Sequence, residues 1–328
     1  MGLLDDAYFE HEMTFRIIEI TGSAVALSLQ LMIGCFAIYK MNVHSMATVM
    51  QIKLLFVFSF LLACFHSICD TIEHVYAISH GTTPDVLYLC TVSSGALFYL
   101  SMLAHLVIRL HVTYGESVYR MTTRTICVFS TIFILLFLSV LCVVLAWIII
   151  LNYNEDTGWL MLNIAGLSFL VFFIIGSVLA VRNFVGTLSK LAKSHGTFNG
   201  NCHGDKIALN KVQQKMVNLS GKYVLLFGLA ILSTIISFGF AFIVSNEIGG
   251  TFYSFDFSLN LYLSVLQFSF ASEHYRRFCG CMDVKMRLAA ESRIKMAIHE
   301  DSVRLPSPRK PNLDGADSVT VTEADDVV

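Results

Sequence analysis

Three ionisable residues at a regular spacing, His66, Asp70 and His74, are the strongest candidates for chemistry in this chain. Steps of four residues place all three on one face of a helix, and Glu73 lies beside them. They fall in a largely apolar stretch, where ionisable residues are costly and indicate function. We expect them to line a polar pocket for a ligand. The alternative is a helix end wetted by water, which tolerates the same residues.

Seven apolar segments must position these residues. The chain has 328 residues, of which 55% are hydrophobic and 14% charged, whereas a globular domain carries about 25% charged residues. A helix needs about 20 apolar residues to cross a bilayer. The sequence therefore predicts an all-α integral membrane protein with a seven-transmembrane helix bundle over 16–272, its spans lying near 16–39, 53–78, 86–110, 125–151, 159–185, 217–245 and 252–272.

Lys and Arg are sorted between the segments that separate these spans. All of the 22 Lys and Arg residues except Arg16 fall in alternate segments. Cytoplasmic loops retain Lys and Arg, which predicts an extracellular N-terminus over 1–15 and a cytoplasmic C-terminus. No Lys-Asp-Glu-Leu retention signal occurs, so we expect the plasma membrane. The opposite face is acidic, which favours a cationic ligand. The bilayer is the expected partner, and nucleic acid is not.

The predicted pocket gains members from other spans. Glu19 on the first span, and Asp256 and Asn260 on the seventh, are expected to contribute to it. Zinc is an alternative occupant, because His and Asp both bind it. Seven-span zinc hydrolases typically carry a His-x-x-x-His, and the late spans have no such pair. We therefore expect no metal, no cofactor and no enzymatic activity.

A basic amphipathic helix is predicted directly after the last span, over 273–299. Phe278, Met282 and Met286 recur on one face of it, and such a helix lies along the inner leaflet. Cys279 and Cys281 are candidates for S-acylation, and the alternative is two reduced thiols. Residues 300–328 carry few large apolar side chains, which predicts a disordered cytoplasmic tail.

Seven spans, an outside N-terminus, a basic third inner loop and an amphipathic helix after the last span together resemble a G-protein-coupled receptor over residues 1–300. The rhodopsin-like motifs differ. Arg109, in HLVIRLHVTYGES, has no acidic residue before it, and spans five to seven contain no proline. Span seven has no Asn-Pro-x-x-Tyr and no lysine. The chain is thus similar to a divergent branch, of the type found in protists.

The resemblance implies a signalling receptor that binds a ligand from outside and couples to a heterotrimeric G protein. Contact charges for this transducer would come from the inner loops, although retention of positive charge explains them equally: Arg120, Arg124, Lys190, Lys193, Lys211 and Lys215. His105 and Arg109 are switch candidates in the inner half of span three. Arg109 would pair with Glu273 in an inactive state, or extend to lipid phosphates.

Two further interpretations remain open. Cys69 and Cys90 lie at the outer ends of spans two and three, where a disulfide is possible, or they are buried thiols. The chain could also be a transporter or channel for a small solute, or a structural membrane protein without a ligand. Transporters often show inverted repeats and helices broken by proline, and this sequence shows neither feature in its spans.

Overall fold

Long helices make up nearly all of the described chain. The computed structural model describes residues 12–43, 50–80, 85–114, 121–152, 155–196, 211–243 and 249–304, and none of these forms a strand. The helices are α2 (Glu12–Val43), α3 (Met50–His80), α4 (Asp85–Tyr114), α5 (Thr123–Asn152), α6 (Glu155–Gly196), α7 (Lys211–Ile243), α8 (Gly249–Leu266) and α9 (Ser272–Arg304).

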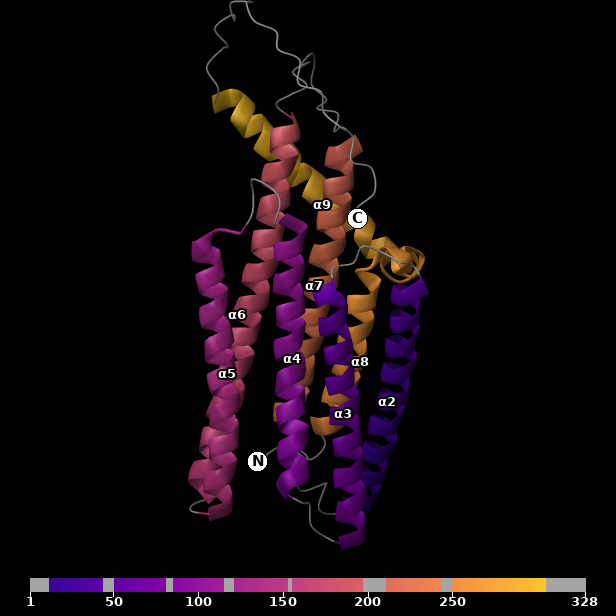
Figure 1. Cartoon of the computed structure of the whole chain (residues 1–328), viewed down its shortest axis with the longest axis vertical. Helices are drawn as coiled ribbons and strands as arrows, with labels where there is room; N and C mark the ends of the chain where they lie inside the picture. The colour runs from indigo at the N-terminus through magenta and orange to yellow at the C-terminus, as the bar shows by residue number, and fades with distance from the viewer. Residues whose placement is uncertain are drawn as a thin grey trace, which may run out of the picture.

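Helices α2 to α8 run side by side and alternate in direction, and α9 lies at one end of the bundle (Figure 1). We call this end the α9 end. The opposite end, here called the distal end, is formed by the first turns of α2, α4, α6 and α8 and the last turns of α3, α5 and α7.

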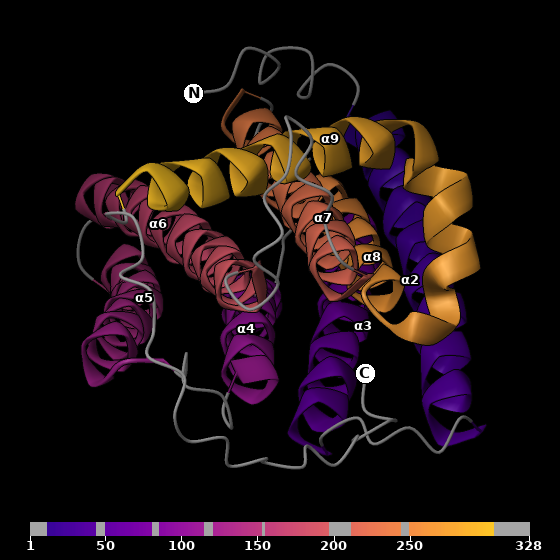
Figure 2. The same ribbon diagram turned by 90° about the horizontal axis from the view of Figure 1, so that it is seen from above.

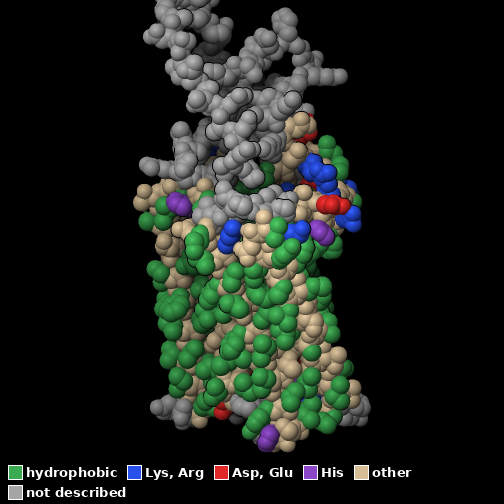
Figure 3. Space-filling model, turned by 45° about the vertical axis from the view of Figure 1, so that its right-hand side comes forward, with side chains coloured by type: hydrophobic (Ala, Val, Ile, Leu, Met, Phe, Trp, Pro, Cys, Tyr) green, Lys and Arg blue, Asp and Glu red, His purple; other side chains and the backbone are tan. Residues whose placement is uncertain are grey.

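The outer surface of the bundle is apolar. Six helices, α2 to α7, each contain a segment long and apolar enough to cross a membrane. Large hydrophobic side chains such as Leu61, Ile134 and Leu160 point outward and are more than half exposed. On the face in Figure 3, hydrophobic side chains cover the middle of the described bundle, while Lys and Arg gather at the α9 end. The chain is therefore a membrane protein, as the composition predicted.

Helix α8 differs from these six because it is short and polar. It has 18 residues and falls outside the candidate membrane spans among the described helices. It packs against α2, α3 and α7, and its Asp256 and Asn260 are buried. The bundle interior thus shelters its ionisable and amide side chains, while its apolar Phe255 and Leu259 are exposed.

Aromatic rings join α8 to the centre of the bundle. The ring of Phe257 lies 4.2 Å from that of Phe98 and 5.2 Å from that of Tyr99, both on α4. Tyr99 also contacts Phe173 of α6, with ring centroids 5.3 Å apart. All four side chains are buried, and such pairs stabilise a core beyond their buried area.

The predicted seventh span, 252–272, ends earlier than expected. Helix α8 stops at Leu266, where the amides of Gln267 and Phe268 donate to carbonyls three residues back, at 3.2 and 3.0 Å. A short 3-10 helix, Ser269–Ala271, follows before α9 begins. These tighter i to i+3 bonds end the α-helix and turn the chain.

Helix α9 crosses the end of the bundle over α7 and α6 (Figure 2). Its inner side buries Tyr275, Cys279 and Asp283, while Phe278 and Met282 are 59% and 48% exposed. Phe278 and Met282 of the predicted apolar stripe are thus exposed, although the ring of Phe278 also contacts Tyr262 of α8, with centroids 5.5 Å apart. Of the two acylation candidates, Cys279 is 1% exposed. Cys281 is exposed.

The connection between α6 and α7 is shorter than the sequence indicated. Helix α6 continues to Gly196 and α7 begins at Lys211, so helices cover much of the loop expected over 186–216. Lys190 and Lys193 lie on the extension of α6, and Lys211 and Lys215 on the first turns of α7. Arg124 is exposed at the start of α5. Arg120 and the tail beyond Arg304 lie outside the described residues.

Candidate ligand-binding cavity

A cavity of about 310 Å³ lies at the distal end of the bundle, with a polar wall from α3 and an aromatic wall from α4, α5 and α6. Every helix from α2 to α8 contributes a lining residue. Its polar lining comprises Arg16, His66, Asp70, Glu73, His74, Thr91 and Asn163, and its aromatic lining Tyr88, Tyr99, Trp147, Trp159, Phe169, Phe238, Tyr253 and Phe257.

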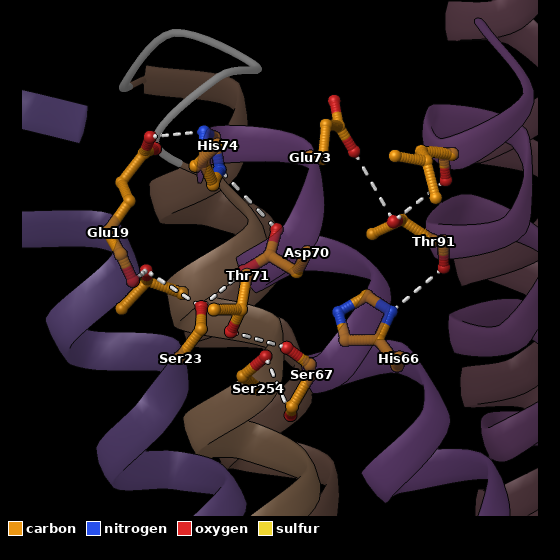
Figure 4. A network of polar contacts seen from close by, with 12 residues as sticks. Glu19, Ser23, His66, Ser67, Asp70, Thr71, Glu73, His74, Thr91 and Ser254 are labelled. Atoms are coloured by element: carbon orange, nitrogen blue, oxygen red, sulfur yellow. Dashed lines mark hydrogen bonds and ion pairs between the residues drawn. The ribbon is translucent and has the colours of Figure 1, made fainter. Parts of the chain in front are cut away.

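His74 joins α3 to α2 at the polar wall (Figure 4). Its Nδ1 lies 3.0 Å from a carboxylate oxygen of Glu19, and its Nε2 lies 3.6 Å from Asp70. All three side chains are at most 4% exposed. Because each ring nitrogen faces a carboxylate, the arrangement suits a protonated imidazolium, which donates from both nitrogens. Glu19 therefore lies behind His74 rather than in the cavity lining.

Asp70 connects α3 to α2 and to the start of α8. Its Oδ2 accepts a hydrogen bond from Ser23. A Cβ atom on Gly250 would lie only 1.9 Å from its Oδ1, so the absent side chain of Gly250 is what allows α8 to approach this carboxylate. Asp70 is 2% exposed and is held in place from three helices.

The His66 ring has one nitrogen that is bonded and one that is not. Its Nδ1 lies 2.8 Å from the carbonyl oxygen of Thr91; since a carbonyl only accepts, Nδ1 carries the proton. Its Nε2 is buried and has no hydrogen-bond partner among the described residues. The ring packs edge-on against Phe257, with centroids 4.7 Å apart.

Glu73 extends the polar wall toward α4. Its Oε2 accepts a hydrogen bond of 3.3 Å from the hydroxyl of Thr91, whose carbonyl also binds His66 (Figure 4). The side chain of Glu73 is 6% exposed and lines the cavity. No Lys, Arg or His of the described chain forms an ion pair with Glu73, in contrast to Glu19 and Asp70.

Sequence reasoning missed the aromatic wall. Tyr88 stacks on Trp147 at 4.5 Å between ring centroids, and Trp147 meets Trp159 edge-on at 6.2 Å. The indole nitrogen of Trp147 is buried without a hydrogen-bond partner among the described residues. The signal in the sequence was weak, because Trp and Tyr near span ends normally indicate the membrane interface.

Asp256 and Asn260 do not line the cavity, contrary to expectation. Asp256 accepts hydrogen bonds from Tyr99 of α4, at 2.7 Å, and from Ser233 and Thr234 of α7. Asn260 donates to the main-chain carbonyl of Asp256 at 3.0 Å. Asp256 therefore ties α4, α7 and α8 together, and neighbouring hydroxyls occupy its oxygens. Sequence spacing gave no hint of this, because the contacts form between different helices and Tyr99 lies 157 residues from Asp256.

A second polar cluster that the sequence did not indicate joins α2, α3 and α8 below Asp70. Gln30 donates to the hydroxyl of Ser67 at 3.0 Å and to the carbonyl of Ser254 at 3.1 Å. Ser67 in turn donates to Ser254 at 3.1 Å. All three are buried, so these bonds help to hold α8 against α2 and α3, since interhelical hydrogen bonds contribute to helix association in lipid.

Arg109 has a different partner from the one expected. Its guanidinium donates to the side-chain oxygen of Gln267 at 2.9 Å and to the carbonyl of Gln267 at 3.1 Å. It also lies over the rings of Tyr223 and Phe268, 5.3 and 5.0 Å from their centroids. A guanidinium at the last carbonyls of a helix is favourable. Arg109 therefore connects α4 to α7 and to the end of α8.

The expected partner Glu273 and the neighbour His105 lie apart from this contact. Glu273 is exposed on α9 and pairs with Arg277, four residues on. It belongs to α9 because α8 ends before it, which is why the predicted Arg109–Glu273 pair is wrong. His105 is 2% exposed, and its Nε2 has no hydrogen-bond partner among the described residues.

Cys69 and Cys90 form no disulfide. Both are free thiols, Cys69 buried and Cys90 half-buried. The adjoining ends of α3 and α4 are joined instead by the bonds of Thr91 to His66 and Glu73. Across the described residues, no group of three or more His, Cys, Asp and Glu side chains is arranged to hold a metal ion.

Comparison with known protein families, curated protein sequences and solved structures finds no match to this chain.

Proposed function

We propose that this protein is a seven-helix signalling receptor. In this proposal α8 is the seventh crossing, the distal end faces outside the cell, and the α9 end faces the cytoplasm. A ligand enters the cavity from outside, and a heterotrimeric G protein binds at the α9 end. The proposal is supported by one observation: a cavity lined by residues from all seven helices α2 to α8. A ligand bound there could contact every helix of the bundle and so change how the helices pack.

Charge supports this orientation. The basic residues gather at the end opposite the cavity, on the extension of α6, the first turns of α7, the start of α5 and along α9. Cytoplasmic segments retain such residues. The same surface presents Lys190 and Arg124 as exposed charges for a transducer.

Arg109 supports a switching mechanism. It lies between the cavity and the α9 end, and it holds α4 against α7 and the last turn of α8. Receptors switch by shifts of packed helices, and a ligand changes the population of two states only through a difference in affinity between them. A ligand that moves α4 relative to α8 would break the Arg109–Gln267 contact.

Nucleotide exchange on purified heterotrimeric G proteins tests the proposal. The protein in nanodiscs is compared with the Arg109→Ala variant and with empty nanodiscs. We expect wild type to accelerate exchange, and Arg109→Ala to raise the rate without ligand about tenfold. A tenfold change in a two-state ratio needs about 1.4 kcal/mol, less than a hydrogen bond to a charged group can contribute.

The matched control is Arg182→Ala, which removes an exposed Arg on α6 and should leave the rate unchanged. Uptake of a solute into proteoliposomes, together with no exchange on any G protein by wild type or by Arg109→Ala, would contradict the receptor proposal and favour a transporter.

A further inference from the structure

We propose that the cavity binds a small organic monocation, a protonated arylalkylamine, with its ammonium group at Glu73 and its ring against Trp147. This inference deepens the proposed function and rests on it, because it names the ligand class of the same cavity. Three features of the lining carry it: an unmatched carboxylate, buried polar atoms without partners, and a wall of aromatic rings.

The charges of the polar wall differ by one. Three carboxylates, those of Glu19, Asp70 and Glu73, are buried there together with two basic side chains, Arg16 and His74. His74 lies between Glu19 and Asp70 and can pair with both when protonated. Glu73 is the carboxylate with no described ion-pair partner, and an unpaired charge is costly in a buried site. A ligand with one positive charge completes the wall.

Unpartnered polar atoms also indicate an occupant. The Nε2 atom of His66 is buried without a partner, and the Thr91 carbonyl fixes it as the unprotonated nitrogen of a neutral ring. An unprotonated ring nitrogen can accept a hydrogen bond. Glu73 and His66 both contact Thr91 (Figure 4), Glu73 through the Thr91 hydroxyl and His66 through its Nδ1. Buried polar groups are normally satisfied, and this nitrogen has no partner among the described residues.

The aromatic wall selects the rest of the ligand. Tyr88, Trp147 and Trp159 pack on one another, and Tyr253 and Phe257 line the cavity from α8. Aromatic faces attract organic cations and stack with rings. A volume of about 310 Å³ is at the small end of the range for ligand pockets. A one-ring amine therefore suits the cavity better than a peptide or a lipid.

Tryptophan fluorescence measures this binding directly. The chain contains two Trp residues, Trp147 and Trp159, and both line the cavity. Purified protein in nanodiscs is titrated with phenethylamine, and with 2-phenylethanol and 3-phenylpropionate as its neutral and anionic analogues. We expect phenethylamine to change the Trp emission saturably, and to bind at least about tenfold more tightly than either analogue.

The decisive variant is Glu73→Gln, which keeps the shape of the side chain and an acceptor for Thr91 but removes the charge. We expect it to weaken phenethylamine binding about tenfold or more and to leave binding of 2-phenylethanol unchanged. The matched control, Asp85→Asn, removes an exposed acid at the same end of the bundle and should bind like wild type. An unchanged Tm of each variant shows that the fold is intact.

Equal affinity for phenethylamine and 2-phenylethanol, or an unaltered affinity for phenethylamine in Glu73→Gln, would overturn the inference. Should Glu73→Gln fail to fold, Trp147→Phe serves instead and should retain amine selectivity while losing most of the emission change. Because binding is measured without a transducer, amine binding without nucleotide exchange would contradict the receptor proposal alone. Exchange stimulated by the neutral analogue would contradict the amine inference alone.

Discussion

Cys279 and Cys281 are two residues apart on α9, so their side chains point to different sides of the helix. Cys279 is 1% exposed, and burial, together with nearby Asp283, raises the pKa of its thiol. Cys281 is exposed. Since the thiolate is the reactive form of cysteine, Cys279 is both hidden and less reactive, and S-acylation is left to Cys281.

We expect Cys281→Ser to abolish palmitate incorporation in cells, and Cys279→Ser to retain most of it. Metabolic labelling with an alkyne-tagged palmitate, followed by capture and quantification, measures this. Loss of label in Cys279→Ser with full label in Cys281→Ser would show that α9 turns its other side to the bilayer.

Single residues were predictable from sequence where local spacing determined their position. The i, i+4 steps from His66 to His74 predicted a shared helix face, and all three residues line the cavity. Asp256 was not predictable, because its partners Tyr99, Ser233 and Thr234 come from distant parts of the chain.

At the scale of the helices, the close contact between α2 and α3 depends on the absence of a side chain at Gly34. A Cβ atom on Gly34 would lie 2.3 Å from two ring carbons of Phe60 and 2.8 Å from its Cγ. A turn of the ring about its Cβ–Cγ bond leaves Cγ in place. Because Cγ itself is too close, such a turn cannot make room for the new Cβ atom. Small residues allow such close approach of helices in lipid.

We expect Gly34→Ala to destabilise the bundle by about 1–3 kcal/mol, the usual cost of overpacking, and to lower Tm by several degrees. Gly228→Ala on α7 is the matched control, because its new Cβ atom would have no neighbour within 4 Å. Thermal denaturation in one detergent measures both variants. Equal Tm values would mean that α2 and α3 lie further apart.

Hydropathy identified the helices well and their ends poorly. Six of the seven expected spans correspond to helices apolar enough to cross a membrane. The extension of α6 to Gly196 was missed because its last turns carry no continuous apolar signal. The end of α8 at Leu266 was missed for a different reason. The turn at Gln267 and Phe268 is held by Arg109 from α4, a contact between segments far apart in the sequence.

At the scale of the whole molecule, the proposed function depends on the seventh crossing. The cavity and the basic surface lie at opposite ends of the bundle. Helix α8 leads from the distal end to α9. As a seventh crossing it would place α9 on the side of the basic surface and the two chain ends in different compartments. Helix α8 contains fewer apolar residues than its neighbours, so hydropathy alone does not decide this, whereas its packing against α2, α3 and α7 favours a crossing.

Epitope tags fused before Met1 and after Val328, stained with antibody in intact and in permeabilised cells, test this crossing most directly. We expect the tag at Met1 to be stained in intact cells and the tag at Val328 only after permeabilisation. Staining of both tags in intact cells, or of neither, would place both ends in one compartment and contradict a receptor with its cavity outside and its transducer surface inside.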